Sequence, residues 1–169
     1  MTAAKTLALY SRQPKLVCRY CRGTAITNKY MATINAQRRQ MIRNAVTRRP
    51  EAIVDVTIDL WERLAAALIS IVGEGGFHSL YSRSTHLTSV TYPWMVLVHP
   101  WQQTDSRFAD LKISLEGRDF AESSEASIAL LITFVDILAL LIGEDLTTSI
   151  LRSAWGDDAL DIAGKELKE

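Results

Sequence analysis

The stretch EAIVDVTIDLWERLAAALISIVGEGG, residues 51–76, decides the fold class of this chain. Its apolar residues recur every three or four positions, the spacing that places them on one face of an α-helix. Acidic residues recur at similar intervals on another face, and Arg63 follows Asp59 at the spacing of a helical ion pair. The closing glycines predict the helix end, because glycine readily adopts the left-handed conformation of a C-cap. The apolar face comprises Val54, Ile58, Trp61, Leu64, Ala65, Leu68, Ile71 and Val72.

Further helices follow the same pattern along the chain. Asp119 and Glu122 have the spacing of a capping box, which satisfies the free backbone N–H groups of a helix start. They open the most apolar stretch of the sequence, which is short for a membrane span and contains Asp136, a costly residue in a bilayer. We therefore predict a buried helix and no membrane partner. Helices are predicted over residues 34–49, 51–72, 77–91, 104–115, 120–142, 145–155 and 157–165.

These elements predict an all-α fold, an antiparallel bundle of about five to seven helices joined by short corners. Two corners resemble each other, because VGEGGFHSL at 72–80 aligns with IGEDLTTSI at 142–150, at an offset of 70 residues. One interpretation is a duplication, which makes the chain two related helical hairpins. The other is that any helix–glycine–helix corner has this pattern, because a C-cap requires it. The sequence leaves both interpretations open.

Basic and acidic residues are divided unevenly along the chain. The first 50 residues hold 11 Lys and Arg and no acidic residue, whereas the other 119 hold 8 Lys and Arg and all 19 Asp and Glu. We predict a flexible basic extension over residues 1–30 and a single all-helical domain over residues 31–169. The basic segment favours an anionic partner, so nucleic-acid binding is an alternative function. The other interpretation is that these cations pair within the protein with the acidic ridge that follows. The cations are Arg38, Arg39, Arg43, Arg48 and Arg49, and the ridge is Glu51, Asp55, Asp59 and Glu62.

The two cysteines, Cys18 and Cys21, form a single C-x-x-C motif in the basic segment. Two thiolates supply half of a closed zinc site, and the sequence contains no second pair. We therefore predict no metal and no cofactor from this motif. The sequence shows neither a disulfide framework nor a secretory signal, which favours a cytoplasmic protein.

A polar row on one predicted helix has the most enzyme-like composition in the chain. Glu74, His78, Ser82 and His86 recur at four-residue spacing, so they share one helix face. His78 and His86 are about 12 Å apart along the helix axis, and one zinc ion with bonds of about 2 Å cannot bind both. As a catalytic set, the row lacks a nucleophile elbow. We predict an exposed polar face, and the alternative is a metal- or haem-binding sensor that uses His78 or His86.

Asp136 lies among apolar residues of the predicted helix 120–142. A buried carboxylate without a partner is costly, so Asp136 needs a cation if it is buried. Arg83 and Arg152 occupy similar places in the two hairpins, and they are the candidate partners of a buried ion pair. The alternatives are that Asp136 faces solvent or that the pair is purely structural.

No phosphate loop, dinucleotide-binding glycine pattern, zinc-protease motif or nucleophile elbow occurs in the sequence, so no catalysis is evident. An all-α body with clustered aromatic residues favours a small regulatory or adaptor module that acts by protein–protein association, including self-association as a dimer. The predicted interface contains Tyr92, Trp94 and Trp101.

Overall fold

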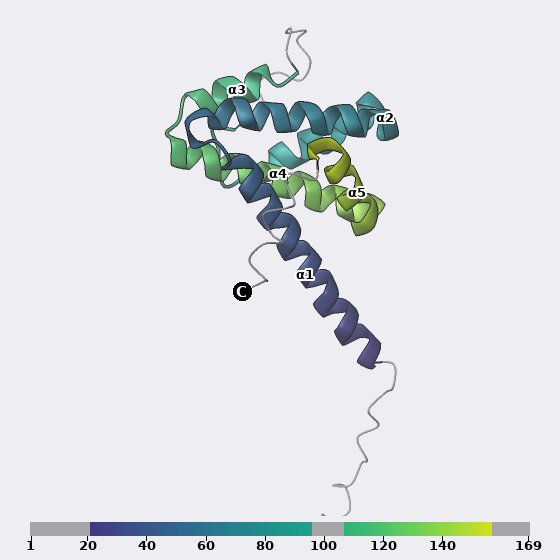
Figure 1. Ribbon diagram of the computed structural model, residues 1–169. Coiled ribbons are helices and arrows are strands. Elements are labelled where there is room, and N and C mark those ends of the chain that lie inside the picture. The colour runs from purple at the N-terminus through teal and green to yellow at the C-terminus, as the bar shows by residue number, and fades with distance from the viewer. Residues whose placement is uncertain (1–20, 96–106, 157–169) are drawn as a thin grey trace, which may run out of the picture. The chain divides into compact units, whose positions relative to one another are not determined.

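The computed structural model in Figure 1 describes residues 21–95 and 107–156, with side chains from Thr33 onward. All regular secondary structure in these ranges is helical, which confirms the predicted all-α class for the described residues. Contacts within the chain divide it into two units, Met1–Asn35 and Ala36–Glu169. The first unit contains the beginning of helix α1, and every side-chain contact described below lies within the second unit.

Helix α1 spans Cys21–Val46, so it begins earlier than the predicted start at residue 34. The chain contains neither glycine nor proline between Gly23 and Pro50, so no residue in this stretch breaks the helix. Apolar periodicity therefore underestimates the length of this helix. After α1, Pro50 begins a short 3-10 helix, Pro50–Ala52, where the missing proline N–H would have no partner in any case.

Helix α2, Ile53–Thr88, contains two of the predicted helices as two arms that meet at Gly73. Gly73 has φ 74° and ψ 167°, a non-helical conformation that favours glycine. The predicted helix end at these glycines is therefore confirmed. The chain reverses direction at this break, so that Tyr81 of the second arm contacts Trp61 of the first (Figure 1).

Three further helices follow, namely α3 (Ala109–Glu116), α4 (Phe120–Ile142) and α5 (Glu144–Trp155). The predicted bounds of α4 are confirmed, and the Asp119 side chain caps it by accepting a 2.8 Å hydrogen bond from the Glu122 backbone N–H. The predicted cap of α5, Asp145, is wrong. Gly143, with φ 89°, occupies the cap position because it forms the corner, and this leaves Asp145 in the first turn.

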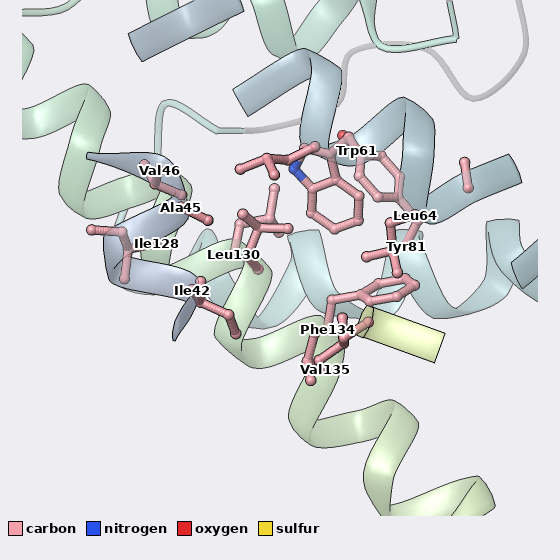
Figure 2. Close-up of a cluster of buried hydrophobic side chains, with 14 of the residues drawn as sticks. Ile42, Ala45, Val46, Trp61, Leu64, Tyr81, Ile128, Leu130, Phe134 and Val135 are labelled. Atoms are coloured by element: carbon pink, nitrogen blue, oxygen red, sulfur yellow. The ribbon is translucent and has the colours of Figure 1, made fainter. Parts of the chain in front are cut away.

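Aromatic rings from α2 and α4 meet at the centre of the core (Figure 2). Trp61 lies 5.0 Å from Tyr81 and 5.1 Å from Phe134 between ring centroids, edge to face in both cases. This geometry is favourable because the ring edge is electropositive and the ring face electronegative. At the end of α5, Trp155 donates a 3.0 Å hydrogen bond from Nε1 to the Leu60 carbonyl. This bond fixes α5 against the first arm of α2.

Helix α4 is the one helix, among those the structure describes, that is long and apolar enough to cross a membrane by length and composition. In the structure it packs against α2 and α5. Helix α3 begins at Ala109 with Phe108 at the cap position, so the predicted helix start at Thr104 is wrong. The predicted helix 157–165 lies outside the described residues. The largest buried side chains of α4 are Leu130, Leu131, Phe134 and Leu138.

Candidate functional site

Arg38 is the only charged residue that is buried in the part of the chain whose side chains are described. It connects α1 to α4 and to α5. Its Nη2 atom lies 2.6 Å from Asp136 Oδ1, and its Nη1 atom donates to Glu144 Oε2. Arg39 Nη2 lies 2.7 Å from the second Asp136 oxygen. We call Arg38, Arg39, Asp136 and Glu144 the arginine cluster.

The arginine cluster lies at the edge of the core, where three helices meet. The side chains of Asp136 and Glu144 are 31% and 15% exposed, so both carboxylates are partly removed from water. Each carboxylate accepts hydrogen bonds from at least one guanidinium group, and such charge-assisted bonds are strong and directional. The arrangement is therefore suited to holding α1 against α4 and α5, rather than to supplying a free acid or base.

The predicted partners of Asp136 are wrong. Arg83 and Arg152 are exposed, and neither forms an ion pair with any residue that the structure describes. Each is next to a buried residue in its helix, so helical geometry turns the arginine side chain outward. A cation beside Asp136 was predicted only for a buried side chain. Asp136 is partly exposed, and its cations come from α1.

Among the side chains that the structure describes, neither Glu51 nor any acidic residue of α2 forms an ion pair with α1. Lys112 of α3 lies 3.1 Å from Asp55, and this hydrogen bond, together with the carboxylate charge, raises the pKa of the Lys112 ammonium group. Arg63 lies 3.0 Å from Asp59, which confirms the predicted ion pair along the helix. All four side chains are well exposed, so these pairs contribute little to stability.

The predicted polar row lies on the second arm of α2. Ser82 and His86 are exposed, His78 is half-buried, and Glu74 is exposed and lies 3.1 Å from Arg107. The structure thus places the row on an outer face of the arm, as is usual for a surface helix. Among the described residues, no group of three or more His, Cys, Asp or Glu is arranged to hold a metal ion. The metal- or haem-sensor alternative stays a prediction.

Tyr92 and Trp94, two residues of the predicted interface, are half-buried and pack against the core. Their ring centroids are 6.0 Å apart, edge to face. The Arg118 guanidinium carbon lies 4.9 Å from the centroid of the Trp94 ring, within the range of a cation–π contact. Both rings are therefore engaged within the molecule. Trp101 lies outside the described residues.

Sequence reasoning missed an apolar surface where α4 meets α5. Leu140 is 87% exposed, Leu141 is 66% exposed and Leu146 is 47% exposed. We call these three residues the leucine corner. The first two were assigned to the buried helix because α4 is apolar on nearly every side. Their position within one turn of Gly143 is the signal that could have identified them, because a helix commonly loses its packing neighbours near its end.

Arg43, Arg48 and Arg49 are exposed near the end of α1. They form no ion pair with any carboxylate in the described ranges, so they are available to an anionic partner. Nucleic-acid binding stays a prediction on this basis. The C-x-x-C motif lies outside the residues whose side chains are described.

Comparison with known proteins gives no relative, because no protein-family model, no curated protein and no solved structure matches the chain.

Proposed function

We propose that this protein is a small helical module that acts by protein–protein association, and that the leucine corner is part of its binding surface. The observation that carries this proposal is the 87% exposure of Leu140. A single exposed leucine is ordinary on a protein surface, but Leu140 stands within seven positions of two further exposed leucines, Leu141 and Leu146, at the same corner. Grouped exposed apolar side chains on a folded protein are typical of contact surfaces.

We also propose that α2 and the α4–α5 pair are two copies of one helical hairpin. Gly73 and Gly143 occupy corresponding positions in the two proposed copies, with φ of 74° and 89°. Their conformation alone is weak support, because Gly156 shares it at φ 78°. Stronger support comes from the burial pattern, because most residues buried in one copy have a buried residue at the corresponding position of the other, with exceptions such as Ala139 against Ile69 and Ser84 against Ala154. Residues buried at equal places are Leu60 and Leu130, Trp61 and Leu131, Leu64 and Phe134, Ala65 and Val135, Leu68 and Leu138, Phe77 and Thr147, Leu80 and Ile150, and Tyr81 and Leu151.

The two proposed copies differ at positions around the corner that neither copy buries. The first hairpin has small or polar residues at two of these three positions, whereas the second has leucine at all three. Because the positions lie outside the core, the larger side chains do not serve packing. An association role for the second corner accounts for the difference. The compared residues are Ser70 with Leu140, Ile71 with Leu141, and Gly76 with Leu146.

Two matched variants test the leucine corner. The first, Leu140→Ser/Leu141→Ser/Leu146→Ser, removes the apolar surface and leaves the core unchanged. The control, Val90→Ser/Ile113→Ser, removes two apolar side chains that are 78% and 68% exposed elsewhere. Wild type and both variants are crosslinked in the cells that make the protein, to capture other partners. In a separate experiment each is mixed with a differently tagged second copy, to detect self-association. We expect the first variant to lose at least about tenfold in partner recovery, because truncating central apolar contacts removes most binding energy.

Circular dichroism melts check that all three proteins are equally folded. Recovery of the same partners in equal amounts by both variants would contradict a role for the leucine corner. A wild-type protein that elutes as a strict monomer and crosslinks to nothing would contradict the association function itself.

A further inference from the structure

From Ala36 onward, helix α1 packs on the rest of the second unit through side chains other than the aromatic rings around Trp61. The rings around Trp61 come from α2, from α4 and from Phe108, which precedes α3. The Trp155 hydrogen bond joins α5 to α2. The buried apolar side chains of α1 belong to the same cluster as these rings. In the described part of α1, the buried residues besides Arg38 are Met41, Ile42, Ala45 and Val46.

One row of residues along α4 runs from beneath α1 to the leucine corner. Ile128, Ile132, Asp136 and Leu140 recur at four-residue spacing, so they share one helix face. Val46 of α1 lies beside Ile128 in Figure 2, and both belong to one buried cluster. The arginine cluster holds α1 at Asp136. Leu140, the next residue of the row, is uncovered.

The contacts that hold residues 36–46 are of a kind that breaks at a lower free energy than the contacts of a compact core. Between residues 36 and 46, α1 buries four apolar side chains, two of them completely, and this stretch contains no aromatic residue. Its polar attachment is an ion cluster, whose attraction is offset by the removal of charges from water. The residues that follow α1, Thr47 to Arg49, are exposed and non-helical. Elements with few buried contacts open locally at a lower free energy than the rest of a fold.

We propose that residues 36–46 are a detachable cover, held shut by the arginine cluster, whose release extends the leucine corner along α4 toward Ile128. A partner that binds the whole row must compete with α1, so the cover limits access to the binding surface. The use of the enlarged surface rests on the proposed association function. The opening of α1 does not depend on that function.

Amide hydrogen exchange of the full chain tests the opening. The opened variant, Asp136→Asn/Glu144→Gln, removes both negative charges at nearly constant shape and leaves Arg38 without a carboxylate. The control, Asp55→Asn/Asp59→Asn, removes two exposed charges that pair on the surface. We expect exchange over residues 36–46 to rise by on the order of tenfold or more in the opened variant, because breaking a buried pair leaves an uncompensated charge. Exchange over α2 to α5 stays unchanged, and the control matches wild type throughout.

Two results would overturn the cover. Equal acceleration over α1 and over α2 to α5 means that α1 is part of one cooperative fold, and unchanged exchange over residues 36–46 means that the arginine cluster does not hold it. A second variant, Arg38→Leu/Asp136→Leu/Glu144→Leu, keeps the test valid if the opened variant does not fold. Apolar groups that replace a buried ion cluster often stabilise a protein. This variant is expected to slow exchange over residues 36–46, and an equal or faster rate there contradicts the proposal.

The fluorescent dye anilinonaphthalene sulfonate, which binds exposed apolar surface, tests the link to the leucine corner. We expect the opened variant to bind more dye than wild type, and Leu140→Ser to reduce the binding in both backgrounds. Dye binding by the opened variant that does not respond to Leu140→Ser would overturn the continuity of the row. Failure of the partner experiment would leave the exchange and dye results intact, so the two proposals fail separately.

Discussion

At the scale of the residue, Asp136 shows what local sequence reveals about a side chain. Its place in an apolar helix indicated that it needs a cation if it is buried, and in the structure two arginines pair with this partly exposed carboxylate. Arg38 and Arg39 lie 98 and 97 positions away in the sequence. Spacing carries no information about a contact at that separation, because only the packing of α1 against α4 brings the charges together. The candidates chosen by position in the hairpins, Arg83 and Arg152, were wrong for this reason.

Tyr81 leads to a prediction about stability in alkaline solution. Burial raises the pKa of its hydroxyl, and the nearby Asp110 carboxylate raises it further. A tyrosine in an unfolded chain titrates at about pH 10. Above that pH the unfolded chain loses a proton that the folded protein retains, so the free energy of unfolding falls by up to about 1.4 kcal/mol per pH unit from this group. Below about pH 10 the hydroxyl is neutral in both the folded and the unfolded state, so it does not make the free energy of unfolding depend on pH.

The variant Tyr81→Phe removes the titrating group from the core. We expect its free energy of unfolding to fall less steeply with pH than that of wild type above about pH 10, and with a similar slope below about pH 9. Urea unfolding across this range measures both slopes. Parallel curves for the two proteins at all pH values would show that the Tyr81 hydroxyl titrates alike in the folded and unfolded states.

At the scale of the element, the break in α2 depends on one glycine. Gly73 has φ 74°, where a Cβ atom would meet no heavy atom within 4 Å. Because φ 74° with ψ 167° is a region that essentially only glycine adopts, Gly73→Ala is expected to destabilise by about 1–3 kcal/mol, from backbone strain alone. Gly75 lies in the helix that follows, also in open space, so Gly75→Ala is expected to stabilise by about 0.5–1 kcal/mol. Equilibrium unfolding of both variants measures the two effects, and a shift of the same sign in both would contradict the assigned conformation.

Helix bounds were predictable where a capping residue borders an apolar run. Asp119 and Gly143 mark the two ends of α4 by their own conformations, so its bounds needed no tertiary information. Helix α1 extends well before the predicted start at residue 34, because no glycine or proline interrupts the chain between Gly23 and Pro50.

At the scale of the whole molecule, the Trp155 indole joins the two proposed hairpins through the Leu60 carbonyl. Trp155→Phe removes this buried hydrogen bond and part of the ring, so we expect a loss of roughly 1–2 kcal/mol in the free energy of unfolding. Because α5 packs on α2 and α4, the loss should affect all of them in one cooperative transition. Far-ultraviolet circular dichroism and tryptophan fluorescence, followed in the same urea titration, measure both the loss of stability and the cooperativity of unfolding. Separate transitions for the two signals would contradict a shared core.

The sequence by itself determined the all-α class, the buried face around Trp61, the bounds of α4 and the end of the first α2 arm at the glycines. These features follow from periodicity, capping and backbone conformation, which act over a few residues. Only the tertiary structure decided that Arg38 enters the core, that Tyr92 and Trp94 pack inward, and that Leu140 remains exposed. Exposure and ion pairing depend on which element covers a given face, and residues far apart in the chain determine that.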